Sequence, residues 1–343
     1  MSVPTPTLAH LARLASPDGL FEHAHLSSPR TDIGYCTADA GRLLALTVDL
    51  AGDEHAASLA RISLDFLHRA HLGGGQFRLR QRASGEWTTD PSSDDANARA
   101  LVGLAAAAAA APWPDVRRDA AALFGQAASY RSPYPRSTAY AVVGAARWLE
   151  NETAQQLVRD AAHDVVRSHA NTTWPWPETR LTYANALLPH AALVVGMVLH
   201  DEARLVDALS LLAWLVERET RDDHFSFTPV AGRDASSSAP AFDQQPVEAW
   251  AMIDACSLAF DVTGDATWRE HARRAGEWFT GRNDVGIDVF DPQTGGGYDG
   301  LGPEGPNLNQ GAESTIAFNA TMVQLQSLTS SAPAHAARKA SSR

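Results

Sequence analysis

Six segments of this chain share one design, in which a polar or acidic first turn leads directly into small and apolar residues. Between them lie amphipathic stretches whose apolar residues recur at i, i+3, i+4 and i+7, the period of a helix with one buried face. Equivalent points in successive segments lie 43 to 65 residues apart, which is the length of one helical hairpin. The six segments are residues 34–46, 93–104, 135–149, 180–199, 243–260 and 309–323.

The alternation of amphipathic and apolar helices constrains the fold. Helices that are apolar on all sides need protein on all sides, and six hairpins provide this when they stack and close into a ring. We therefore predict an all-α fold, an (α/α)6 toroid of six helical hairpins, over residues 1–328. A disordered tail is expected at 329–343, where the sequence is polar, basic and rich in Ala and Ser. Parallel inner helices would present their polar first turns at one mouth, rimmed by the inserts at 73–91, 221–241 and 283–309.

The charge and motif content exclude several classes of function. Lys and Arg number 28 against 40 Asp and Glu, a formal charge of -12, which argues against nucleic acid or an anionic membrane as the partner. The sequence has no nucleotide-binding glycine motif, no HExxH and no GxSxG. Cys36 and Cys256 lack nearby ligand partners, so we expect no metal site, no disulfide and no cofactor. Without a secretion signal or a long apolar stretch, we expect a cytoplasmic protein with no membrane span.

Acidic residues in the inner first turns are the candidates for catalysis. Each also suits a capping role, because a carboxylate at a helix start accepts free N–H groups and complements the helix dipole by about 0.3 to 1 kcal/mol. Several acids around one cavity also suit glycosidic bond cleavage, in which one carboxyl protonates the leaving oxygen and a second activates water or attacks the sugar. The candidates are Asp39, Asp95, Asp243, Glu248 and Glu313.

Aromatic, amide and cationic side chains near the same mouth are the candidates for substrate binding. Trp174 and Trp176 lie in a Pro-interrupted loop, from which an indole can stack on a pyranose face. Neutral amides can donate to and accept from hydroxyl groups, whereas arginines bind carboxylate or phosphate. Each of these types also has a structural role as a cap, core residue or ion pair. The amides and arginines selected are Asn185, Gln244, Gln245, Asn309, Gln310, Arg42 and Arg78.

Ordered strings along the sequence point to one family. They include GLFEHA at 19–24, GYCT followed by Asp39 and Arg42, SDDANARA at 93–100, LTYANALLPHAAL at 181–193, DQQPVEA at 243–249, TGGGYDGL at 294–301 and NQGAEST at 309–315. Over about residues 10–326 the chain resembles a bacterial six-hairpin glycosidase-like family, often named glycosyltransferase because it is fused to or encoded beside family 4 type glycosyltransferases. The resemblance implies an (α/α)6 toroid in a carbohydrate context. Its motifs add His23, Tyr35, His224, Tyr298 and Asp299 to the candidates for substrate binding.

The sequence leads to one preferred function and two alternatives. We expect a carbohydrate-active enzyme, a glycoside hydrolase or phosphorylase, that cleaves a glycosidic bond of a short oligosaccharide or glycoconjugate with inversion. The acids at 243–248 would pair with those across the ring. One alternative is a non-catalytic sugar-binding or scaffolding partner of a separate glycosyltransferase. The family context favours this alternative. Ala38 also favours it, because the family pattern has two acids after GYCT and alanine replaces the first of them here. The other is a sugar 2-epimerase, which calls for paired histidines that His190 and His224 do not clearly supply.

Overall fold

Helices make up most of the chain that the structure describes. The computed structural model describes residues 3–330 except 90–91, 166 and 169–172. Six helices form an inner layer, and they are α2 (Thr37–Asp49), α4 (Asp94–Ala110), α6 (Pro135–Ala146), α8 (Leu187–Leu199), α10 (Pro246–Thr263) and α12 (Ala312–Ser330). The others are α1 (Ala9–Leu14), α3 (Ala56–Ala70), α5 (Pro114–Ala127), α7 (Glu152–Ala161), α9 (Glu202–Glu219) and α11 (Ala266–Glu277).

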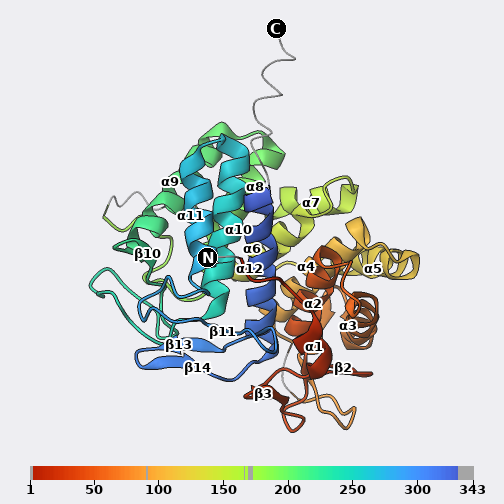
Figure 1. The fold of residues 1–343 in the computed structure, drawn as a ribbon. Coiled ribbons are helices and arrows are strands. Elements are labelled where there is room, and N and C mark those ends of the chain that lie inside the picture. The colour runs from red at the N-terminus through yellow and green to blue at the C-terminus, as the bar shows by residue number, and fades with distance from the viewer. Residues whose placement is uncertain (1–2, 90–91, 166, 169–172, 331–343) are drawn as a thin grey trace.

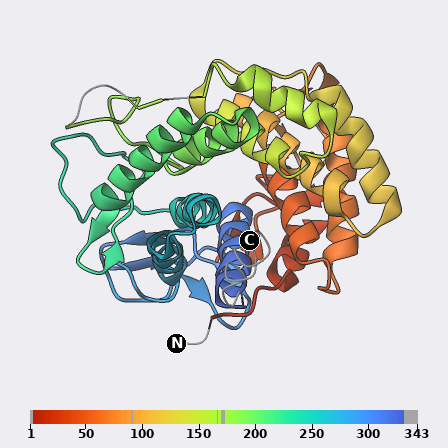
Figure 2. The same ribbon diagram turned by 90° about the horizontal axis from the view of Figure 1, so that it is seen from above.

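The inner helices form a closed ring. In chain order each inner helix packs against the next, and α12 packs against both α2 and α1, which closes the circle. Seen from above, the chain runs once around this ring, with outer helices on its periphery (Figure 2). The side view shows the helix pairs standing next to one another (Figure 1). The predicted (α/α)6 toroid is confirmed.

Small residues let neighbouring inner helices approach at backbone distance. A Cβ atom added to Gly41 in α2 would lie 2.3 Å from the carbonyl oxygen of Arg99 in α4, and one added to Gly103 would lie 2.3 Å from that of Gly41. Gly144 in α6 leaves similar room for the backbone of Val102. The composition of α4, with its buried run of alanines, therefore reflects close packing within the ring.

The strands are short and connect the helices in antiparallel pairs. Each has two or three residues, and most of those labelled in Figure 1 lie at the end of the ring where α12 begins. They are β1 (Ala15–Ser16), β2 (Gly19–Leu20), β3 (Ala24–His25), β4 (Ser28–Pro29), β5 (Tyr35–Cys36), β6 (His71–Gly73), β7 (Gln76–Phe77), β8 (Arg80–Gln81), β9 (Thr220–Arg221), β10 (His224–Phe225), β11 (Phe290–Asp291), β12 (Gly296–Gly297), β13 (Gly300–Gly302) and β14 (Gly305–Asn307).

Most helix boundaries differ by a few residues from the sequence-based expectation, and two of the differences bear on the site or on the extent of the domain. The fourth inner segment, predicted from residue 180, becomes helical only at Leu187, because Ala184 has a φ of 45° and interrupts the helical backbone. At the other boundary, α12 continues to Ser330, beyond the predicted end of the domain at 328. The rest of the predicted disordered tail, 331–343, lies outside the described residues.

Candidate active site

A cavity of about 440 Å³ opens at the end of the ring where the inner helices begin. Its walls come from segments far apart in the sequence, as a ring of parallel inner helices requires. The side chains are strongly polar, and carboxylates outnumber cations. The carboxylates are Glu22, Asp39, Asp95, Asp243, Asp299 and Glu313, and the basic side chains are Arg42, Arg80, Arg99 and His23.

A second cavity, of about 470 Å³, lies deeper along the ring axis. All six inner helices contribute side chains to it. Arg42, Arg99 and Val247 line both cavities and are largely buried. These three side chains therefore form the floor of the first cavity.

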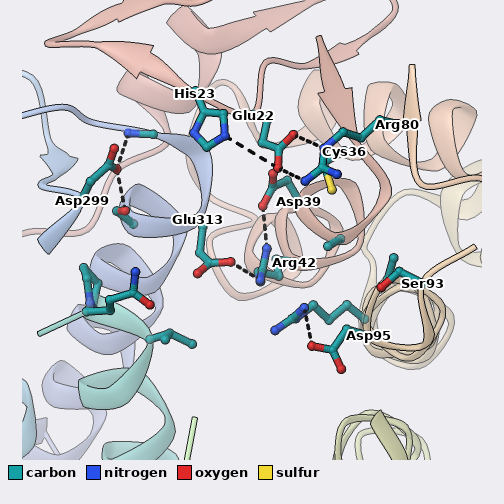
Figure 3. Close-up of a pocket in the computed structure, with 18 of the residues that line it drawn as sticks. Glu22, His23, Cys36, Asp39, Arg42, Arg80, Ser93, Asp95, Asp299 and Glu313 are labelled. Carbon is teal, nitrogen blue, oxygen red and sulfur yellow. Dashed lines mark hydrogen bonds and ion pairs between the residues drawn. The ribbon is translucent and has the colours of Figure 1, made fainter. Parts of the chain in front are cut away.

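Arg42 joins two of the cavity carboxylates. Its Nη1 donates to Asp39 at 2.6 Å and its Nη2 donates to Glu313, so one buried guanidinium bridges the starts of α2 and α12 (Figure 3). Burial raises the pKa of Asp39 to about 7, although Arg42 opposes this shift. For Glu313, burial is outweighed by the charges of Arg42 and Arg99, which lower its pKa.

Asp95, in the first turn of α4, is held by three side chains. Its Oδ1 accepts a hydrogen bond from the Ser137 hydroxyl at 2.7 Å. Its Oδ2 accepts from the Tyr183 hydroxyl and lies 3.3 Å from Nη1 of Arg99. Burial raises the pKa of this carboxyl, but Arg99 and the two hydroxyls outweigh burial and hold the pKa below its ordinary value. Asp95 is therefore ionised at neutral pH.

Asp243 differs from the other carboxylates of the cavity. Among the described residues, no side chain or backbone group forms a hydrogen bond or ion pair with its carboxyl group. Asp243 is an exposed residue of the cavity, and partial burial of its carboxyl group alone raises its pKa. Asp299, by contrast, accepts hydrogen bonds from the N–H of Gly311 and the hydroxyl of Ser314, at 2.9 and 2.7 Å. Since α10 is opposite α4 in the ring order, Asp243 and Asp95 belong to opposite walls.

Glu22, Cys36 and Asp39 form a cluster that has the residue types of a metal site. One potential ligand atom from each lies within 4.8 Å of the others. However, Arg80 binds both oxygens of Glu22, at 2.7 and 2.8 Å, and Arg42 binds Asp39. Burial raises the pKa of Cys36 to about 12, so its thiol is neutral. These side chains fit an arginine network better than a metal cation.

The cavity brings together part of the predicted site. Eight predicted residues line it, namely His23, Asp39, Arg42, Asp95, Asp243, Gln245, Asp299 and Glu313. Eleven do not, and these are Tyr35, Arg78, Trp174, Trp176, Asn185, His224, Gln244, Glu248, Tyr298, Asn309 and Gln310.

Glu248 and Asn185 meet each other below the mouth. Glu248 is 3% exposed, and its carboxylate accepts the backbone N–H groups of Ala184 and Asn185 and the side-chain amide of Asn185. Burial and the nearby charge of Glu219 raise the pKa of Glu248. In this structure the carboxylate of Glu248 holds the loop before α8 and does not reach the cavity.

The two loop tryptophans pack into the protein. Trp176 is fully buried and stacks on Trp214 of α9, with ring centroids 6.0 Å apart. Trp174 meets the edge of the same ring, and its indole N–H donates to the carbonyl oxygen of Glu178. Both indoles therefore lie in the outer layer, because α9 offers them an aromatic partner.

The other predicted side chains outside the cavity make local contacts. Gln244 donates to Asp284 at 2.7 Å, and His224 lies 3.1 Å from the other oxygen of the same carboxylate. This network ties the loop after α11 to the start of α10. The remaining predicted side chains contact loop or core residues, and these are Tyr35, Arg78, Tyr298, Asn309 and Gln310.

Among the side chains at the site that sequence reasoning missed, three lie close to the proposed chemistry. Glu22 and Arg99 line the cavity, and Tyr183 bonds to Asp95. All three lie within the strings GLFEHA, SDDANARA and LTYANALLPHAAL, which carry the family resemblance. The strings were thus a signal for their importance, but the sequence did not show which of their polar residues turn inward.

Comparisons with solved structures identify the fold. No family model and no curated protein matches the chain. A sugar epimerase from a ruminal bacterium aligns with a TM-score of 0.69 at 11% identity, covering 95% of both chains. Cellobiose 2-epimerase from Bacillus thermoamylovorans B4167 gives 0.69 at 11% identity, covering 95% of this chain and 96% of that one. The GH76 α-mannanase BT2949 from Bacteroides thetaiotaomicron gives 0.62 at 11% identity and covers 94% of both.

The chain has a six-hairpin glycosidase-like fold. At 11% identity this likeness establishes the fold alone, and any function has to be argued from the cavity itself. In the described part of the chain, no helix combines the length and apolar character needed to cross a membrane.

Proposed function

We propose that this protein is a carbohydrate-active enzyme that cleaves a glycosidic bond with inversion, with Asp243 as general acid and Asp95 as general base. The observation that carries the proposal is the contrast between these two carboxyls. Asp243 has no partner among the described residues and a raised pKa, whereas Asp95 has three partners and a lowered pKa. Environments that move two pKa values apart are typical of an acid and base pair.

The proposed reaction uses the two walls of the cavity. The carboxyl of Asp243 gives its proton to the leaving glycosidic oxygen as the bond to the anomeric carbon breaks. The carboxylate of Asp95 takes a proton from a water molecule, whose oxygen forms the new bond on the opposite face of the sugar ring. Carboxyls on opposite walls suit inversion, because that reaction needs room for a water molecule between the sugar and the base.

The charge of the cavity supports water as the nucleophile. Each of its three arginines already has a carboxylate partner, and six carboxylates face them. A phosphate anion would therefore have to compete with these carboxylates for the arginines, which is unfavourable. The same argument favours neutral or amino sugars over uronic acids and sugar phosphates.

The test is a panel of neutral α- and β-linked disaccharides and short oligosaccharides, followed by proton NMR with and without inorganic phosphate. We expect Asp243→Asn and Asp95→Asn each to lower kcat by about 10²- to 10⁴-fold, the usual contribution of a general acid or base. Asp119→Asn, on the outer helix α5, is the control and should keep wild-type turnover. An inverted anomer as the first product supports opposite walls, and a retained anomer contradicts the assignment of Asp95 as base.

A sugar epimerase is the second candidate, since His23 lines the cavity with its Nε2 3.8 Å from Glu22. An epimerase exchanges a carbon-bound proton with solvent and creates no new reducing end. The same NMR panel in D₂O therefore separates the two reactions. Deuterium at C2 without new reducing ends, lost in His23→Ala, favours the epimerase.

The non-catalytic hypothesis makes a different prediction. Ala38 lines the cavity at the position where the family resemblance leads us to expect an acid. If wild type binds sugars without converting them and Ala38→Asp gains turnover, the chain is a binding protein that has lost an acid.

A further inference from the structure

The loop before α8 has a backbone conformation that requires support. Ala184 has a φ of 45°, in the left-handed region that residues other than glycine seldom adopt. Its N–H donates to Oε1 of Glu248 at 2.5 Å. The other carboxylate oxygen, Oε2, accepts from the backbone N–H and the side-chain amide of Asn185, each at 3.2 Å. The buried carboxylate thus binds this strained loop at three points.

Arg136, at the start of α6, holds the same loop from the other side. Its Nε donates to the carbonyl oxygen of Tyr183 at 2.6 Å, and its Nη2 donates to the side-chain oxygen of Asn185 at 3.1 Å. The guanidinium also lies over the Tyr183 ring, 5.0 Å from its centroid. Backbone and ring of Tyr183 are both fixed in this way.

Tyr183 connects this fixed loop to the active site. Its hydroxyl donates to Oδ2 of Asp95, while Oδ1 of Asp95 accepts from Ser137, the residue after Arg136. We propose that Glu248 is a positioning residue, which holds residues 183–185 so that the Tyr183 hydroxyl fixes the carboxylate of Asp95. The catalytic meaning of this link rests on the proposed function, in which Asp95 is the base.

Other charges also face the two carboxylates. Around Asp95 they are Arg99 on α4, Arg42 on α2 and Glu313 on α12. Around Glu248 they are Glu219 on α9 and Arg136 on α6. None of these groups is altered by removing the Tyr183 hydroxyl. A change in the titration of Asp95 in that variant therefore reports the loss of one hydrogen bond.

The experiment is a carbon-13 NMR titration of the Asp95 carboxyl, with its signal assigned through Asp95→Asn. Because a hydrogen bond to the ionised carboxylate favours that form, Tyr183→Phe should raise the pKa of Asp95 by about one unit. Glu248→Gln should produce a similar rise, since an amide nitrogen cannot accept from Asn185 and the loop is released. The double variant should shift no further than either single one, because both changes break one link.

Glu219→Gln is the matched control for Glu248→Gln. Glu219 is a buried acid near Glu248, but it accepts hydrogen bonds from Thr228 and does not touch residues 183–185. The titration of Asp95 should be unchanged in this variant. If Glu248→Gln does not fold, as judged by near-ultraviolet circular dichroism, Asn185→Ala takes its place, because it removes the side-chain amide that donates to Glu248 and accepts from Arg136.

The outcomes separate this inference from the proposed function. A rise in Tyr183→Phe without a rise in Glu248→Gln means that Glu248 has a structural role only, and overturns the inference. A rise in both, in a protein that converts no sugar, supports the link and removes the proposed function. In an active protein, the acidic limb of the kcat profile should move to higher pH in both variants, by the same amount as the titration.

Discussion

At the scale of single residues, the cavity matches its arginines to carboxylates. Arg42 bridges Asp39 and Glu313, while Arg80 binds Glu22 and Arg99 pairs with Asp95. A buried charge that loses its partner destabilises a protein strongly, because it is no longer solvated by water or by the partner. The polar walls of the cavity are thus part of what stabilises the ring.

This argument predicts the effect of Arg42→Ala on stability. The variant leaves Asp39, which is 2% exposed, without its cation, so the free energy of unfolding should fall by about 3 to 5 kcal/mol. Urea unfolding followed by circular dichroism measures the change. Arg30→Ala is the control, because Arg30 pairs with Asp32 on the surface and should have little effect. Equal stability of the two variants would contradict the role assigned to Arg42.

The sequence predicted the location of some site residues but not of others. The first-turn position of Asp39, Asp95 and Glu313 was enough to bring them to the mouth, because the helix start fixes where the side chain lies. Glu248 has the same position on α10, yet its carboxylate turns to Ala184, whose unusual backbone no sequence pattern reveals. Trp176 is buried against Trp214, which lies 38 positions later in the sequence. Local sequence patterns could not predict this contact.

At the scale of elements, the geometry of the cavity depends on how closely α2 and α4 approach. Arg42 extends from α2, and Asp95 and Arg99 extend from α4. The contact at Gly41 and Gly103 sets the spacing of these helices. Periodicity predicted both helices, but it did not predict their contact, since glycine in a helix has several explanations.

Gly103→Ala tests the importance of this contact. The new methyl group would lie 2.3 Å from the carbonyl oxygen of Gly41, so the helices have to separate and the free energy of unfolding should fall by about 1 to 3 kcal/mol. The matched control is Gly125→Ala in α5, where nothing lies within 4 Å of the added carbon. Alanine favours the helix there and should leave stability unchanged or raise it by up to about 1 kcal/mol. Thermal unfolding compares the two, and a stable Gly103→Ala variant would falsify the close-contact argument.

At the scale of the whole molecule, the sixfold recurrence of polar first turns was sufficient to predict the toroid. Alternating amphipathic and apolar helices have few other ways to bury six apolar surfaces. The loops could not be predicted in this way. Their short strand pairs, such as β13 with β14, are fixed by contacts with the ring and carry no periodic signal.

Buried acids around the ring predict how stability depends on pH. Burial raises the pKa of Asp39 and of Asp254 to about 7, so above about pH 4 the folded state binds more protons than the unfolded state. Stability therefore falls as pH rises. Burial lowers the pKa of His190 to about 4, and this opposing effect is mostly complete by about pH 7. From about pH 6.5 to 8.5 these groups should lower the free energy of unfolding by about 1 kcal/mol, and the raised pKa of buried Glu248 adds to this fall.

Urea unfolding at several pH values measures this dependence. Of Asp39 and Asp254, Asp254 is the one that lies outside the active site, and Asp254→Asn should make the fall smaller. Stability that rises over the same pH interval would show that these acids are ionised in the folded protein, contrary to the expected sign.

The floor made by Arg42, Arg99 and Val247 turns the cavity into a dead end. A sugar that enters by the mouth has to back out the same way, and a polymer cannot thread through the ring. A glycan would therefore be cleaved near its chain end, once in each binding event. The product bound deepest in the cavity would dissociate last, and until it dissociates no further substrate can bind.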